Sequence, residues 1–164
     1  MKIDQGGATT LAAVIGRDLL AIAAIEHHAA GLSGGAMQRA QLDSLGFALH
    51  NIYNALENSF TQISLSFENH VRDRERWHRE LLDKMFLDLA PLRPAVLMNA
   101  SRPLMSDLLG FRHIFRHAYE FMLDEEKVLA LWRRWLAEGA AVKGALTNFS
   151  GLLRAVAAGD RPAL

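Results

Sequence analysis

The chain has 164 residues, of which 51% are hydrophobic and 22% charged, a balance typical of one globular domain that buries a substantial core. Lysine plus arginine and aspartate plus glutamate both number 18, so the formal net charge is zero. Bulk positive charge is therefore excluded as a means of coating nucleic acid, although a single basic site is not. The absence of cysteine excludes disulfides, thiolate chemistry and a zinc ribbon.

The N-terminal region does not have the pattern of an export signal or a membrane anchor. Residues 1–7 lack the charged-then-apolar order of a secretion signal. The longest purely apolar run nearby, residues 19–25, is too short to span a bilayer. We therefore expect a soluble protein of the cytoplasm.

The first half of the chain predicts two helices separated by a glycine-rich break. Residues 8–30 are rich in alanine, leucine and isoleucine, and residues 31–35 include three glycines that interrupt the helix. Residues 36–68 carry the clearest periodicity, because apolar residues recur there at steps of three and four and mark one buried stripe. The residues of this stripe are Leu42, Leu45, Leu49, Ile52, Leu56, Phe60, Ile63 and Phe67.

The second half predicts three more helices. Residues 77–89 form a shorter helix, and the prolines between residues 91 and 103 predict an irregular connection. A helix then spans residues 105–123, and Asp124 is the expected N-cap of the last helix. The apolar stripe of this last helix consists of Val128, Leu131, Trp135, Val142, Leu146, Phe149, Leu153 and Val156.

Together these patterns predict an all-α fold, an antiparallel bundle of four long helices plus a shorter one. No alternating strand pattern competes with the helical periodicity. We expect residues 1–158 to form a single domain and residues 159–164 to form a flexible tail.

One segment of the 105–123 helix gathers two arginines, two histidines and a tyrosine within eight residues. On a helical wheel at about 100° per residue, residues 108–122 divide into an apolar and a polar side. The apolar side holds Leu108, Phe111, Ile114, Phe115, Ala118, Phe121 and Met122. The polar side holds Arg112, His113, Arg116, His117, Tyr119 and Glu120. An ordinary surface helix is expected to carry lysine and glutamate there, whereas this one carries groups that bind phosphate and transfer protons.

Arg112 and His117 are the natural catalytic pair of this polar side. Histidine titrates near neutrality, and the forked, permanently charged arginine suits a phosphate or a pentacoordinate phosphorus. Five residues along a helix correspond to about 140° and roughly 7.5 Å, so the two side chains flank the face without touching. A split helix start or a two-fold partner is needed to close such a site. From spacing alone, a solvated face and a partner-docking face remain alternatives to a catalytic one.

Two other polar groups admit both a functional and an ordinary interpretation. His113 and His117 have the spacing of two metal ligands on a helix. A metal site needs further ligands, however, and the neighbouring arginines repel a cation, so we expect no metal. Tyr53 and Glu57 are four residues apart and form a polar strip on the 36–68 helix, which we expect to be exposed.

The remaining histidines and tryptophans are expected to be structural. His50 is interpreted as an ordinary surface or partly buried residue. The pair Trp77-His78 opens a helix, and we expect its aromatic ring to seal the core. Trp132 and Trp135 are expected to fill the core and an interface rather than to stack on nucleic acid.

The string Arg112-x4-His117-x-Tyr119 resembles the R-x4-H-x-Y signature of HepT-type toxins in the HEPN superfamily. Phe111 directly before the arginine and the polar His113 directly after it support the resemblance. A bare R-x4-H recurs by chance, whereas the tyrosine, the flanking residues and an all-helical chain of this length make the match more specific. Residues 53–57 and 77–82 also look like this family, so the resemblance covers most of residues 40–135.

The resemblance implies a dimeric, metal-independent ribonuclease without a cofactor, whose cleft forms where two copies of the motif meet. It also implies a minimal nucleotidyltransferase (MNT) antitoxin that silences the toxin by adding AMP to the motif tyrosine, here Tyr119. On this basis Arg112 stabilises the charge that grows on phosphorus, and His117 transfers a proton at the ribose 2′-hydroxyl or the leaving oxygen. The residues expected to support RNA binding are Arg116, His113 and Glu57.

A competing hypothesis makes the chain a non-catalytic helical partner of the nucleotidyltransferase. It would present Tyr119 or a substrate to that enzyme and bind nucleotide phosphate without chemistry. Growth arrest on expression without the partner favours the ribonuclease. A third hypothesis is a helical scaffold, for which Arg112→Ala changes neither growth nor binding.

Overall fold

The computed structural model describes residues 1–32, 38–68, 77–116 and 123–160. Over these ranges the chain is helical and has no strand, apart from one isolated bridge between Leu89 and Arg93. The all-α prediction is therefore confirmed. The α-helices are α1 (Gln5–Ala30), α2 (Arg39–Phe67), α3 (Trp77–Met85), α4 (Arg102–Arg116) and α5 (Glu125–Ala157), and a 3-10 turn, η1 (Asn99–Ser101), leads into α4.

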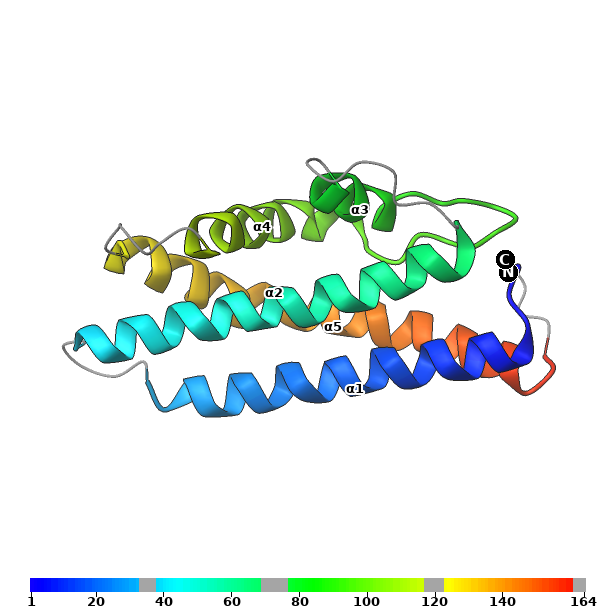
Figure 1. Cartoon of the computed structure of the whole chain (residues 1–164), viewed down its shortest axis with the longest axis horizontal. Helices are drawn as coiled ribbons and strands as arrows, with labels where there is room; N and C mark the ends of the chain where they lie inside the picture. Colours follow the sequence, from blue (N-terminus) through cyan, green and yellow to red (C-terminus); the bar gives the residue numbers. More distant parts are fainter. Residues whose placement is uncertain (33–37, 69–76, 117–122, 161–164) are drawn as a thin grey trace.

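Three long helices form the body of the molecule, and two shorter ones cover one side of it. α1 packs along both α2 and α5, and α2 also contacts α3 and α4 (Figure 1). α4 and α3 lie above α2 in this view, with α4 also in contact with α5. The candidate site described below lies where α2, α3 and α4 converge.

The apolar stripes predicted from the sequence form the core. Every residue of the α2 stripe is buried, and so are most residues of the α5 stripe, while Leu131 and Val156 are half-buried. Trp132 and Trp135 are each only 1% exposed, which confirms that they fill the core. Apolar periodicity predicts the core residues correctly because a helix with one apolar face must pack that face against other helices to remove it from water.

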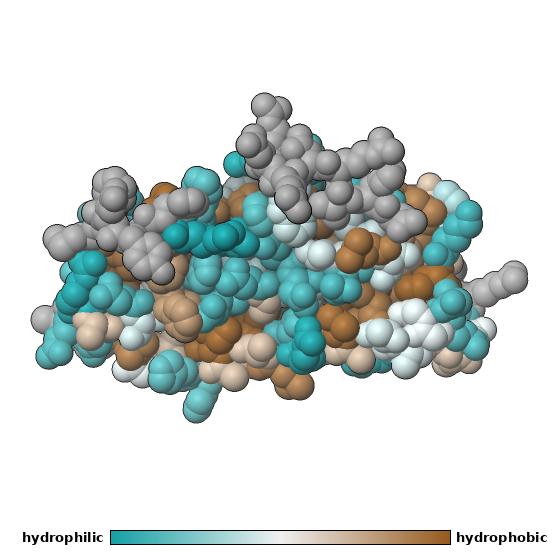
Figure 2. Space-filling model, in the orientation of Figure 1, coloured by the Kyte–Doolittle hydropathy of each residue, from teal (hydrophilic) through white to brown (hydrophobic). Residues whose placement is uncertain are grey.

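The N-terminal helix α1 is long enough to cross a membrane, and its most apolar 18-residue stretch has a mean hydropathy of 1.7. The core helix of a soluble protein has the same properties. Asp18 is buried in α1 and accepts hydrogen bonds of 2.8 Å from Asn58 and Ser59 of α2. On the face drawn in Figure 2, hydrophilic side chains lie between the apolar patches. The packing of α1 on α2 and α5 buries one third of its most apolar stretch.

Several helix ends differ from the prediction. α3 ends at Met85 rather than at residue 89, and α4 begins at Arg102, before Pro103, because proline is tolerated in the first turn of a helix. The predicted continuation of α4 to residue 123 lies partly outside the described residues. Asp124 is the N-cap of α5, as predicted: its side chain accepts from the Lys127 backbone N–H, and this bond lowers the pKa of Asp124.

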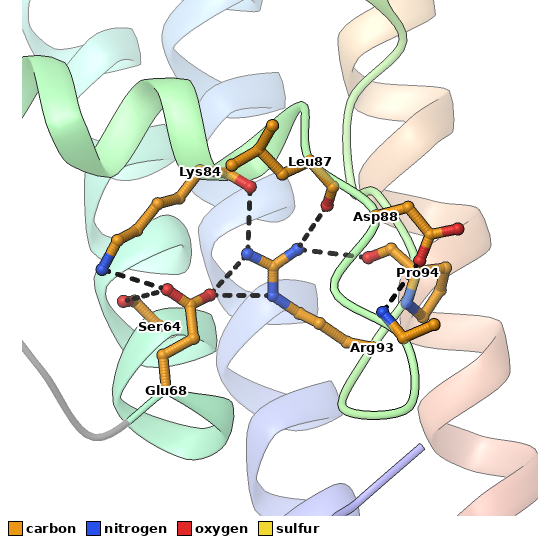
Figure 3. A network of polar contacts seen from close by, with 8 residues as sticks. Ser64, Glu68, Lys84, Leu87, Asp88, Arg93 and Pro94 are labelled. Carbon is orange, nitrogen blue, oxygen red and sulfur yellow. Dashed lines mark hydrogen bonds and ion pairs between the residues drawn. The ribbon is translucent and has the colours of Figure 1, made fainter.

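A fully buried arginine fixes the connection between α3 and α4. Arg93 is 0% exposed and its Nε donates to Glu68 at the end of α2 over 3.0 Å. Its guanidinium also donates to the backbone carbonyls of Lys84, Leu87 and Pro94 (Figure 3). These bonds satisfy backbone carbonyls at the end of α3 and in the following loop. The buried positive charge of Arg93 is also paired with the Glu68 carboxylate.

Two glycines of α5 give a matched test of this packing. A Cβ at Gly139 would come within 2.8 Å of the Trp135 indole, whereas a Cβ at Gly144 would meet nothing within 4 Å. The indole cannot yield easily, because Trp135 is buried and its Nε1 donates to Glu26 over 2.9 Å. We expect Gly139→Ala to destabilise the fold by about 1–3 kcal/mol and Gly144→Ala to stabilise it by about 0.5–1 kcal/mol. Urea unfolding of the two variants checks this, and equal effects would contradict the packing.

Candidate functional site

Arg112 is the centre of a polar cluster between α2, α3 and α4. Its Nε donates to Asn54 Oδ1 over 3.0 Å, and its Nη2 lies 2.8 Å from Glu57 Oε2. Its Nη1 lies 3.4 Å from His78 Nε2. The residue is only 9% exposed, so the wheel was wrong in placing it on the solvated side of the helix. At Arg112 the polar side of α4 faces polar side chains of α2 and α3 instead.

Glu57 connects this arginine to His78. One carboxylate oxygen, Oε2, pairs with Arg112, and the other, Oε1, lies 2.6 Å from His78 Nδ1. Glu57 is 7% exposed, so both of its oxygens are satisfied inside the protein. Removing Arg112 would leave the buried Glu57 charge without its cation, so the cluster depends on this ion pair.

The α2 side of the cluster follows from helical spacing. Tyr53, Asn54 and Glu57 are three and four residues apart, so they present their side chains from neighbouring turns of one face. The strip formed by Tyr53 and Glu57 was expected to be exposed, but both residues are buried. That expectation was wrong because α3 and α4 cover this face of α2.

An aromatic contact borders the cluster near the end of α4. The rings of His50 and Phe115 are 5.1 Å apart, and Phe115 also lies 5.7 Å from Phe111. Gly46 allows Phe115 to approach α2 closely, since a Cβ at Gly46 would lie 3.0 Å from the ring. Burial and then the charges of Arg112 and Arg116 lower the pKa of His50, which favours its neutral form.

Two buried polar atoms beside the cluster have no hydrogen-bond partner within the described ranges. They are His50 Nδ1 and the Tyr53 hydroxyl. Burial raises the pKa of Tyr53, and the nearby Glu57 carboxylate raises it further, so its phenol keeps the proton. A buried hydroxyl without a partner is costly, so its position beside the cluster calls for an explanation.

The other predicted site residues lie around the end of α4 or beyond it. His113 and Arg116 are both exposed on α4. Ile114, assigned to the apolar side, is 61% exposed, which corrects the wheel a second time. His117 and Tyr119 lie outside the described residues. Arg112 and Glu57 are thus the predicted residues that the structure brings together.

Two members of the cluster, Asn54 and His78, lie in the runs that resemble the family (residues 53–57 and 77–82) but had been given no role in the site. Asn54 lies in a run that was interpreted as exposed, and His78 was grouped with Trp77 as a helix start. The Trp77 and His78 rings are 4.5 Å apart, so Trp77 does pack on this histidine. The available signals were this resemblance and the three-residue spacing of Asn54 and Glu57. Periodicity within a helix does not predict which other helix it will contact. The contact of His78 on α3 with Arg112 on α4 therefore follows only from the fold.

Within the parts of the chain that the structure describes, no three histidine, aspartate or glutamate side chains are grouped closely enough to hold a metal ion. The cluster has one carboxylate, Glu57, and one imidazole, His78. The Arg112 guanidinium contacts both of them and the Asn54 amide. Such a set favours an anion over a cation, because arginine donates in a fixed fork.

A comparison with known proteins identifies the family. The family described as "HepT-like protein" matches residues 44–153, a stretch that includes α2, α3, α4 and most of α5. The curated proteins and the solved structures that were compared contain no significant match. The match contains all four residues of the polar cluster as well as the R-x4-H-x-Y string. The chain therefore belongs to the HepT-like proteins of the HEPN superfamily.

Proposed function

We propose that this protein is the toxin of a bacterial toxin–antitoxin pair and cleaves RNA without a metal ion. The observation that carries the proposal is the position of Arg112, a buried arginine held by Asn54, Glu57 and His78 in a chain of the HepT-like family. A guanidinium fixed in this way loses little side-chain freedom when it binds a phosphate. Three of its five N–H groups have partners among the described residues, which leaves two for a phosphate oxygen.

In this proposal Arg112 stabilises the negative charge that grows on phosphorus in the transition state. One such donor is typically worth about 10² to 10³ in rate. His117 supplies proton transfer, and the exposed Arg116 and His113 hold the RNA backbone. Glu57 supports the site by orienting the arginine rather than by touching RNA.

The zero net charge is consistent with this function. The basic groups proposed to contact RNA, Arg112, His113 and Arg116, all lie on α4. Binding then depends on one cleft rather than on the surface as a whole, and the protein needs no overall positive charge.

We further propose that two copies form a HEPN-like dimer of helical bundles in the cytoplasm, with a cleft at the two-fold axis. An MNT-type nucleotidyltransferase would act as the antitoxin by attaching AMP to Tyr119. The added phosphate and nucleoside would lie near the exposed Arg116 and block access of RNA.

The ribonuclease proposal is tested with purified protein made without a partner and incubated with a mixed RNA pool in EDTA. We expect the parent to cut RNA in the chelator and to leave 2′,3′-cyclic phosphate ends, and we expect His117→Ala to leave the pool intact. Toxicity on expression should be lost in the same variant. A His117→Ala protein that remains as toxic as the parent at matched expression would refute the catalytic role.

One observation favours the non-catalytic alternative. Arg112 is paired with a carboxylate and only 9% exposed, as expected of a structural ion pair. In that case the chain would present Tyr119 to the nucleotidyltransferase without cutting RNA. Absence of cleavage by protein whose intact mass shows no modification would favour this function.

A further inference from the structure

His78 has the surroundings of a proton-transfer group that the R-x4-H motif does not include. It is the second residue of α3, and its side chain is 27% exposed, whereas those of its partners Glu57 and Arg112 are 9% and 11% exposed. Its two ring nitrogens face different groups, with Nδ1 on Glu57 and Nε2 on Arg112. The ring is therefore fixed at both ends and still open to solvent.

The hydrogen bonds define which ring nitrogen carries the proton. An ionised carboxylate only accepts, so Nδ1, at 2.6 Å from Glu57 Oε1, must donate its proton to it. An arginine only donates, so Nε2, at 3.4 Å from Arg112 Nη1, must be the nitrogen with the free electron pair. In this tautomer the electron pair of Nε2 faces the guanidinium.

A carboxylate bound to Nδ1 and a basic Nε2 directed at the reaction is the arrangement of a general base. The carboxylate holds the tautomer and stabilises the imidazolium that forms when Nε2 takes a proton. Nε2 also lies close to the atom that would hold the phosphate, since only 3.4 Å separates it from Arg112 Nη1. A 2′-hydroxyl next to that phosphate falls within reach of the same nitrogen.

We propose that His78 is the general base of RNA cleavage, an inference that rests on the proposed ribonuclease function. Nε2 takes the proton of the 2′-hydroxyl as the 2′-oxygen forms a bond to phosphorus. The bond between phosphorus and the 5′-oxygen breaks, its electron pair leaves with that oxygen, and His117 protonates it. The products are a 2′,3′-cyclic phosphate and a 5′-hydroxyl. Arg112 exchanges its contact with Nε2 for one with a phosphate oxygen.

Two substrates separate the roles of the two histidines. One is ordinary RNA and the other carries a bridging sulfur in place of the 5′-oxygen at the scissile bond, a leaving group that needs no proton. We expect His78→Ala to slow cleavage of both substrates by at least about 10², because the nucleophile lacks its base in each. His117→Ala should be equally slow on ordinary RNA but recover to within about tenfold of the parent on the sulfur substrate.

The control variant is His27→Ala, which removes an exposed histidine of α1 and should leave both rates unchanged. Thermal unfolding shows whether His78→Ala remains folded, and added imidazole should restore part of its rate. A structural role would predict no rescue by imidazole.

The outcomes distinguish this inference from the proposed function. If the parent cleaves RNA in a His117-dependent way but His78→Ala cleaves both substrates within about threefold of it, the base assignment is overturned and the ribonuclease remains. Recovery of the cleavage rate of His78→Ala on the sulfur substrate would also overturn the base assignment, since that result would make His78 the general acid. Absence of cleavage by the parent overturns both proposals.

Discussion

Replacing Arg112 by methionine is expected to lower RNA cleavage by about 10² to 10³ and to destabilise the fold by about 3–5 kcal/mol. The first effect follows from the loss of the donor that would stabilise the phosphorane. The second follows from Glu57, which is 7% exposed and would remain as a buried charge without its cation. Cleavage of a defined RNA and urea unfolding measure the two effects separately.

A second substitution separates catalysis from stability. Glu57→Gln removes the carboxylate charge but keeps an oxygen that can accept from His78 Nδ1. We expect Arg112→Met combined with Glu57→Gln to recover most of the lost stability, because no unpaired charge remains, while cleavage stays at or below the level of Arg112→Met. If cleavage recovered with stability, the arginine would be structural and the catalytic proposal would fail.

Arg93→Met is expected to destabilise the fold by about 3–5 kcal/mol without acting on the candidate site. Arg93 is fully buried, and its loss would leave Glu68 without its closest cation and three backbone carbonyls without a donor. Its guanidinium contacts none of the four cluster residues through the hydrogen bonds described above. The measurement is urea unfolding, combined with RNA cleavage at a temperature where the variant remains folded.

A surface ion pair provides the control for this result. Arg39 and Asp43 are paired in the first turns of α2, with side chains 49% and 52% exposed. Arg39→Ala should change stability by less than about 1 kcal/mol, because water and salt already screen this pair. Equal losses in the two arginine variants would mean that burial of Arg93 contributes little.

The sequence motif predicted the central residue of the candidate site but not the residues that surround it. The R-x4-H-x-Y string indicated Arg112, and the family match now places the chain among the HepT-like proteins. The residues that hold Arg112 came from α2 and α3, and of these only Glu57 had been named beforehand. Asn54 and His78 lie in runs that resemble the family, but their contact with Arg112 could not be predicted, since no pattern along the chain says which helices will meet.

The helices and the apolar face that each one buries could be predicted from residue order alone. The stripe of α2 and the N-cap at Asp124 follow from local chemistry, because an apolar face and a free helix end look the same in any tertiary context. These features depend on residues within one or two turns of each other.

The environment of the polar faces depends on how the helices pack together. A wheel assigns every charged side of a helix to water, but α2, α3 and α4 bring three polar faces together and bury Arg112 against Glu57 and His78. A buried charge is stable only where another element supplies its counter-charge, and that pairing is set by how the helices pack.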